Sequence, residues 1–186
     1  MKIRLATDQI QRDSIVDGEG IRAVIWTQGC IHHCPGCHNP ETHSFQDGIT
    51  VDTEIIKQKI KELEGQDGIT FSGGDPMEQS APCAELAEYC QSLGLNVWCY
   101  TGYTFEELMK KAKHIPTIID FLNNIDVLVD GRFILAEKSY DVVFRGSKNQ
   151  RLIDVKKSLQ MNKAVELEKN NDTLNAKTTK KTYLYI

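Results

Sequence analysis

Three cysteines lie within eight positions, Cys30, Cys34 and Cys37, in the run CIHHCPGC. The first residues lack the apolar core of a signal peptide, so we expect a cytoplasmic protein whose thiols stay reduced. In that compartment, clustered cysteines indicate metal binding or catalysis rather than disulfide bonds. The spacing C-x3-C-x2-C therefore predicts a metal site in this loop.

Two kinds of metal centre fit three cysteines, because three ligands complete neither a structural zinc site nor a fully ligated iron–sulfur cluster. In the first, the thiolates hold three irons of a 4Fe–4S cluster and leave the fourth iron open to a substrate. In the second, a nearby histidine completes a Cys3His zinc site. The candidate histidines are His32, His33, His38 and His43. The zinc alternative lacks a second cysteine pair elsewhere in the chain, and solvent-exposed loop side chains are the simpler interpretation of these histidines.

The remaining three cysteines fit a structural role. Cys83 and Cys90 are seven residues apart with Leu86 and Ala87 between them, which is the spacing of one buried helix face. Cys99 lies within NVWCYT, a run of strand-forming residues. We expect all three to be small side chains of the core.

The elements that must position the cysteine loop alternate between strand and helix. Predicted strands lie at residues 21–27, 69–71, 96–101 and 126–129. Predicted helices lie at residues 52–64 and 81–93, with a third opened by a capping box from Thr104 to Glu107. This alternation predicts parallel βαβ units, and the unusual loops each follow a strand, so they should share one edge.

Four strands, or five or six with weaker candidates, do not close an eight-stranded barrel. We therefore expect an α/β fold, a partial (open) parallel β/α barrel, with an open doubly wound sheet as the alternative. Residues 1–159 should form one domain. Residues 160–186 form a polar C-terminal extension, interpreted as a helical fragment or a mobile tail.

Composition excludes several classes of function. The formal net charge of −4 argues against a nucleic-acid partner. No apolar run approaches the roughly 20 residues that a membrane-spanning helix needs, so we expect no membrane association. The chain is that of an ordinary globular protein with an unusual cysteine loop.

The cysteine loop resembles the signature of the radical S-adenosylmethionine superfamily. Over residues 10–159 the resemblance narrows to the anaerobic ribonucleoside-triphosphate reductase activating proteins, a family of glycyl-radical activases. The matching stretches are DGEGIR at 17–22, SGGDP at 72–76, YTGY at 100–103, VDGRF at 129–133 and RGSKNQ at 145–150. The stretches DGRF and RGSKNQ separate this family from the rest of the superfamily.

The resemblance implies a reaction and its partners. A 4Fe–4S cluster would pass one electron to S-adenosylmethionine, and the resulting 5′-deoxyadenosyl radical would take a hydrogen atom from a glycine of the large catalytic subunit of the reductase. The cofactor carries the chemistry, and the protein binds, orients and excludes side reactions. The electron would come from an external donor such as reduced flavodoxin, because the chain lacks an additional cysteine-rich insert.

The resemblance also assigns site residues. Cys30, Cys34 and Cys37 would ligate the cluster and leave one iron for the amino and carboxylate groups of S-adenosylmethionine. Backbone groups of residues 36–38 would meet its adenine, and the backbone of residues 73–75 would meet its ammonium. The implied cofactor-binding residues are Gly36, Cys37, His38, Gly73, Gly74, Asp75, Asp130 and Arg132.

Three further features carry weaker assignments. Thr101 is a candidate of the same kind as Asp130, and the loop at residues 17–20 is a candidate contact for the substrate glycine. A basic patch for docking a partner would consist of Arg145, Lys148 and Arg151.

The alternatives to this function are another small radical S-adenosylmethionine enzyme, such as a 7-carboxy-7-deazaguanine synthase, and a Cys/His zinc-binding interaction module. The sequence departs from the commoner superfamily pattern at Asp75, which stands where Glu is usual.

Overall fold

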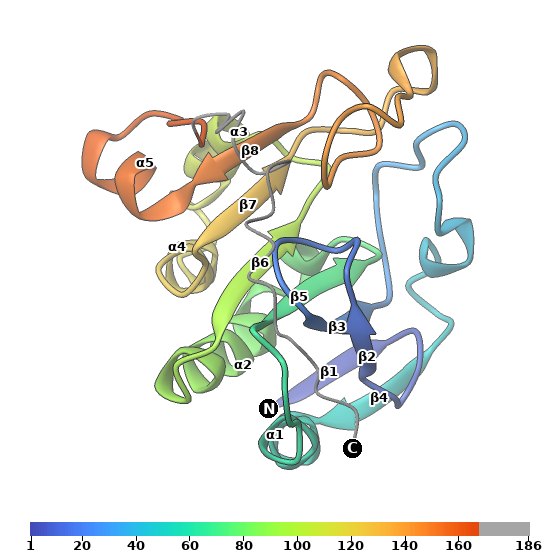
Figure 1. The fold of residues 1–186 in the computed structure, drawn as a ribbon, viewed down its shortest axis with the longest axis vertical. Coiled ribbons are helices and arrows are strands. Elements are labelled where there is room, and N and C mark those ends of the chain that lie inside the picture. The colour runs from blue at the N-terminus through green and yellow to red at the C-terminus, as the bar shows by residue number, and fades with distance from the viewer. Residues whose placement is uncertain (168–186) are drawn as a thin grey trace, which may run out of the picture.

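A single mixed sheet forms the centre of the molecule in a computed structural model, which describes residues 1–167. Four adjacent strands are parallel, and the strands on either side of them are antiparallel to their neighbours. In sheet order the strands are β4 (Ile49–Asp52), β1 (Lys2–Leu5), β3 (Arg22–Thr27), β5 (Gly68–Gly73), β6 (Asn96–Tyr100), β7 (Val127–Asp130) and β8 (Arg151–Asp154), with β2 (Gln11–Ser14) also paired to β3. The order is that of an open sheet whose outermost strands are β4 and β8 (Figure 1).

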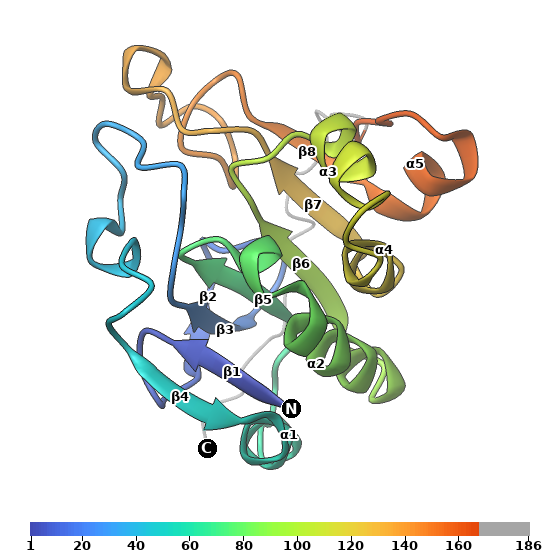
Figure 2. The ribbon, with the colours of Figure 1, turned by 180° about the vertical axis from the view of Figure 1, so that it is seen from behind.

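The helices lie between the strands in the chain. They are α1 (Thr53–Lys61), α2 (Ser80–Ser92), α3 (Phe105–Lys111), α4 (Thr117–Leu122) and α5 (Val155–Met161). Seen from behind, α2, α3 and α4 all lie against the same face of the sheet (Figure 2). A doubly wound sheet would carry helices on both faces. The prediction of a partial, open β/α barrel (a half-barrel) is therefore confirmed, and the doubly wound alternative is not.

The main core lies between this helical layer and the sheet. Alternate strand residues such as Ile25, Phe71 and Leu128 point into it, as the two-residue period of a strand requires. Cys83, Cys90 and Cys99 belong to the same core and are fully buried, which confirms their structural assignment. A smaller cluster on the other face is built on Trp98, Val127 and Val129.

Local signals set the helix boundaries close to where the sequence predicts them. The side chain of Asp52 caps α1 by accepting from the Glu54 N–H. Thr104 and Glu107 form the predicted capping box at the start of α3. At the end of α5, Asn162 adopts the left-handed conformation that terminates a helix.

The antiparallel strands complete the sheet beyond its parallel centre. Beyond α5 the chain returns to the sheet, where Leu167 donates its N–H to the Leu152 carbonyl and Glu166 pairs with Ile153. Most of the predicted C-terminal extension, residues 168–186, lies outside the described residues. Among the helices of residues 1–167, none has the length and apolar character needed to cross a bilayer.

Candidate metal centre

The loops that follow the four parallel strands meet at the end of the sheet where these strands finish, which we call the cysteine edge. There they enclose a cleft of about 280 Å³. The loop after β3 and the loop after β7 rise side by side from this edge (Figures 1 and 2). The cleft is lined by Asp17, Trp26, Cys30, His32, Cys34, Cys37, His38, Asn39, His43, Ser72, Gly73, Gly74, Tyr100, Thr101, Gly102, Gly131, Phe133, Gly146 and Gln150. The three loop cysteines and the Gly-Gly stretch, far apart in the sequence, therefore share one cavity.

The cysteine loop is closed by main-chain bonds and by one amide side chain. Gly29 and Cys30 donate their N–H groups to the carbonyls of Thr42 and His43, at 2.8 and 3.0 Å. Gln28 donates from Nε2 to two further carbonyls of the returning segment, those of Glu41 and Ser44. Residues 31–41 thus form a loop whose two ends are fixed at the sheet edge.

The three thiols differ in exposure, and two of them accept a hydrogen bond from a backbone N–H group. Cys30 is buried, while Cys34 and Cys37 are half-buried. The Cys30 sulfur accepts from the His32 N–H and the Cys37 sulfur from the Asn39 N–H, at 3.5 and 3.4 Å. Burial raises the pKa of Cys30 to about 11 and also raises that of Cys34. Metal binding must therefore release protons from this loop.

The arrangement suits a cluster better than a single ion. Within residues 1–167, no three or more Cys, His, Asp or Glu side chains converge on a position for one metal ion. The Cys3His zinc alternative requires such a convergence, because its four ligands surround one ion. A 4Fe–4S cluster instead distributes its thiolates over separate irons. Three thiols spread around one cleft fit that chemistry.

Asp75 connects three of the loops from inside the protein. Its carboxylate is fully buried and accepts from His32 Nε2, the Thr101 hydroxyl and the Gly102 N–H, each at 2.9 Å, and from the Met77 N–H at 3.0 Å. Both oxygens are thus occupied by groups of the protein. The side chain joins the cysteine loop to the loops after β5 and β6, and its capacity to accept from a ligand is already used.

His32 is not the solvent-exposed loop side chain expected from the sequence. Its side chain is only 2% exposed, and its ring packs edge-on against Tyr103 with ring centres 4.5 Å apart. With Nε2 bonded to Asp75, Nδ1 has no partner among the described residues, although it is buried at the cleft. A buried polar atom without a partner is costly. It fits a site in which a bound group completes the hydrogen bonding.

The Gly-Gly stretch owes its composition to the packing of the chain on itself. A Cβ on Gly73 would overlap the Thr27 backbone, and one on Gly74 would overlap the Gly29 backbone. A Cβ on Gly102 would overlap the pinned ring of His32. These glycines therefore allow the loops at this edge to approach one another, in addition to any approach by a ligand.

Asp130 and Arg132 are placed differently from one another. The Asp130 carboxylate is fully buried and is bound by Arg151 and by the Phe105 N–H at 2.7 Å, so it fixes the start of α3. Arg132 is exposed, and its charge favours the Cys34 thiolate. Asp130 is thus held inside the protein, whereas Arg132 is exposed and its charge acts on Cys34, so Arg132 is the better candidate to meet an anionic group.

The weaker candidate residues from the sequence also differ in their surroundings. Asp17 lines the cleft and Thr101 is bound to Asp75. The three cations of the predicted basic patch have different partners. Arg151 is paired with Asp130 and Glu106, and Arg145 bonds to the Gln150 carbonyl, whereas Lys148 is exposed. They do not form a free docking patch as a group.

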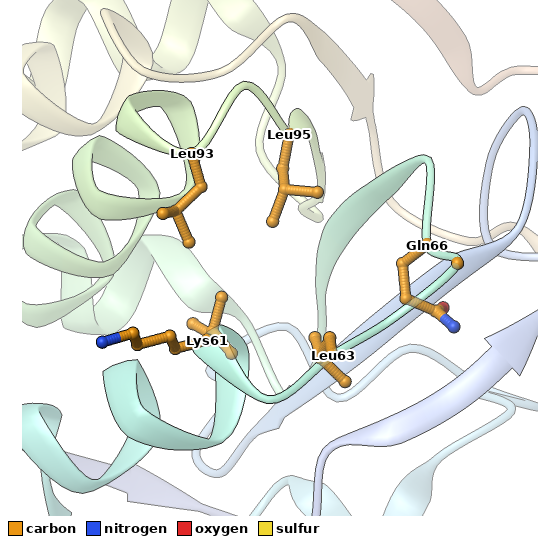
Figure 3. Close-up of a pocket in the computed structure, with 7 residues that line it drawn as sticks. Lys61, Leu63, Gln66, Leu93 and Leu95 are labelled. Carbon is orange, nitrogen blue, oxygen red and sulfur yellow. The ribbon is translucent and has the colours of Figure 1, made fainter.

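A second hollow lies at the opposite edge of the sheet. It has about 220 Å³ and lies between the ends of α1 and α2, lined by Ile60, Lys61, Leu63, Gly65, Gln66, Leu93 and Leu95 (Figure 3). No cysteine, histidine or carboxylate lines it. Its lining offers no metal-ligating side chain, so the candidate chemistry belongs to the cysteine cleft.

Comparison with known proteins identifies the class of this site. Residues 16–153 match the family model described as a 4Fe-4S single cluster domain. The match covers the cysteine loop and the loops that surround the cleft. The fold and the site therefore define an iron–sulfur domain of the radical S-adenosylmethionine type.

Relatives that match most of the chain identify the particular family. An anaerobic ribonucleoside-triphosphate reductase-activating protein of Haemophilus influenzae is 34% identical over 145 residues, 73% of this chain and 89% of the relative. The protein of that name from Escherichia coli K12 is 34% identical over 146 residues, 73% and 90% of the two chains. The chain belongs to this family of activating enzymes. The E. coli protein QueE aligns with a TM-score of 0.46 at 15% identity, over 56% of this chain and 54% of that one.

Proposed function

We propose that this chain activates an anaerobic ribonucleoside-triphosphate reductase by reductive cleavage of S-adenosylmethionine. The observation that carries the proposal is the common cleft of the three loop cysteines and the Gly73–Gly74 turn, in a chain that aligns with activating proteins over nearly their whole length. In that cleft, Cys30, Cys34 and Cys37 would each ligate one iron of a 4Fe–4S cluster. The fourth iron would stay open, as a catalytic metal requires.

When bound, the cluster supplies one electron that breaks the sulfonium C–S bond of S-adenosylmethionine, and the radical formed takes a hydrogen atom from a glycine of the reductase. The chain's own residues hold the reactants. Backbone groups of residues 36–38 and 73–74 would receive the adenine and the ammonium, since both stretches contribute to the cleft. Arg132 would meet the carboxylate, because its guanidinium is exposed beside Cys34.

Asp75 and Asp130 enter this proposal as residues that shape the site. Asp75 would hold Gly74, His32 and Thr101 in register, and its charge would favour the bound ammonium from behind the backbone. Asp130 would fix the start of the loop that carries Arg132. Both carboxylates are fully buried and hydrogen-bonded, so each acts on the ligand through the groups that it holds.

The open half-barrel suits a substrate that is part of another protein. Trp26 and Tyr100 line the cleft, and within residues 1–167 the strand order stays open and does not close into a barrel. We propose that the glycine-bearing segment of the large reductase subunit enters beside Trp26 and Tyr100, past the loop at Asp17. The electron would arrive from an external carrier such as reduced flavodoxin, and the protein would act in the cytoplasm.

The test combines the anaerobically reconstituted protein with the matching large reductase subunit, S-adenosylmethionine and a strong one-electron reductant. Electron paramagnetic resonance should then show a glycyl radical, with one methionine formed for each S-adenosylmethionine cleaved. Alanine in place of Cys34 should abolish both signals because a cluster ligand is lost. Methionine formation without a glycyl radical would retain the superfamily chemistry but refute the reductase as substrate.

A further inference from the structure

Two stretches that narrow the family, DGRF and RGSKNQ, fold into one lobe in the structure. The lobe comprises residues 131–150, between β7 and β8. Gln150 ties the two stretches together, because its Nε2 donates to the Gly131 carbonyl while its Oε1 accepts from the Gly146 and Ser147 N–H groups. Asn149 adds a bond to the Arg132 carbonyl at 2.8 Å. The second motif therefore serves as a brace for the first.

The braced lobe packs directly on the cysteine loop. The ring of Phe133 lies 4.9 Å from the ring of His38, centre to centre. A Cβ on Gly36 would come within 2.9 Å of Leu135. A Cβ on Gly146 would come within 3.0 Å of Phe133. Two glycines, one on each side of the contact, thus allow the lobe to sit against residues 34–38.

The brace sets this contact. Phe133 follows Gly131 and Arg132, whose carbonyls accept from Gln150 and Asn149. Gly146, whose N–H is bound by Gln150, lies against the ring of Phe133. The position of Phe133 against His38 therefore depends on the bonds that Gln150 makes.

We propose that Phe133 and Gln150 are positioning residues of the cluster site: Gln150 holds Phe133 against His38, and the lobe so held keeps residues 34–38 in place. The inference rests on the proposed assignment of Cys34 as a cluster ligand. Groups that hold metal ligands in place slow the loss of the metal, because an ordered ligand loop must be displaced before the metal can leave. The lobe therefore helps the site to retain the cluster.

The experiment measures the cluster of the reconstituted full chain, with and without the brace. In Gln150→Ala, loss of iron to a chelator should be roughly tenfold faster, since the bonds that hold Phe133 against His38 are removed and residues 34–38 are less firmly held. Leu135→Ala removes the contact with Gly36 at a half-exposed side chain and should also release iron faster. Because Leu135 is 54% exposed, this variant should fold even if Gln150→Ala does not.

The matched control is Gln91→Ala. Gln91 is also partly buried and also donates from Nε2 to two groups, the Asn124 carbonyl and the Asp126 carboxylate, but it lies on α2 away from the cleft. Its loss should leave the rate of iron release unchanged. A wild-type rate of iron release in both lobe variants would overturn the inference, as would an equally faster release in Gln91→Ala. Failure of the wild-type chain to take up a cluster would instead refute the ligand assignment beneath it.

Discussion

Asp75→Asn tests whether this carboxylate is a structural junction or a ligand contact. Asparagine has the shape of aspartate but carries one acceptor oxygen and one donor nitrogen. In one orientation the new NH2 group faces the N–H of Gly102, and in the other it faces the N–H of Met77. Either way a buried donor loses its acceptor, and the remaining bonds lose their charge.

The cost follows from these bonds. One buried donor without a partner costs about 1–3 kcal/mol, and the lost charge on the other bonds adds about 1 kcal/mol. We therefore expect the free energy of unfolding to fall by about 3 kcal/mol. For a chain of this length, that corresponds to a drop in Tm of roughly 6–12 °C.

Urea unfolding and calorimetry of both proteins measure the effect. The control is Asp52→Asn at the exposed N-cap of α1, where asparagine caps as well as aspartate and the change should stay within about 0.5 kcal/mol. If Asp75→Asn is as stable as the wild type, the junction described above is wrong. If it also loses affinity for S-adenosylmethionine at unchanged stability, the carboxylate faces the ligand directly.

Five other changes have distinct expected outcomes. Cys99→Ala should lower stability by about 1–2 kcal/mol in urea unfolding but leave iron uptake intact, whereas alanine at any loop cysteine should abolish cluster uptake at nearly constant stability. Arg22→Met removes five hydrogen bonds of a buried guanidinium and should cost about 3–5 kcal/mol, measured in the same way. Thr104→Ala removes the capping box of α3 and should cost about 1 kcal/mol. Burial alone would raise the pKa of Glu85, but hydrogen bonds from Lys57 and Thr53 outweigh burial and lower this pKa to about 2. The contribution of Glu85 to stability is therefore present above pH 4.5 and is lost as the pH falls toward 2. Glu85→Gln should flatten this loss when the free energy of unfolding is measured against pH.

Much of the fold is visible in the sequence because its signals are local. The parallel strands, the buried helix face of Cys83 and Cys90, and the Thr104 capping box each depend on neighbouring residues. The antiparallel strands β1, β4 and β8 are four residues each and too short to show a clear period. Their place in the sheet is decided by pairing with distant strands, which no local pattern records.

In the candidate site, too, local signals are predictable from the sequence and contacts between distant residues are not. The cysteine spacing and the loops that follow strands predict which segments meet, and the cleft brings them together. The buried bonds of His32 and Asp75 join residues 43 positions apart, so neither burial nor partner can be inferred from sequence spacing. The role of Gln150 could not be predicted for the same reason, because its bond to the Gly131 carbonyl joins residues that are distant in the sequence.

The cysteine edge and the opposite edge of the sheet differ in how much space they leave for added atoms. At the cysteine edge, a methyl group added to Gly73 would overlap the backbone of β3, and one added to Gly74 or Gly102 would overlap the cysteine loop. At the other edge, a Cβ on Gly65 or Gly94 meets nothing within 4 Å. Insertions and divergence should therefore accumulate in the turns before β5 and β6, and the turns after them should stay fixed in length. A label or affinity tag inserted near Gly94 should therefore disturb the fold less than one inserted near Gly74 or Gly102.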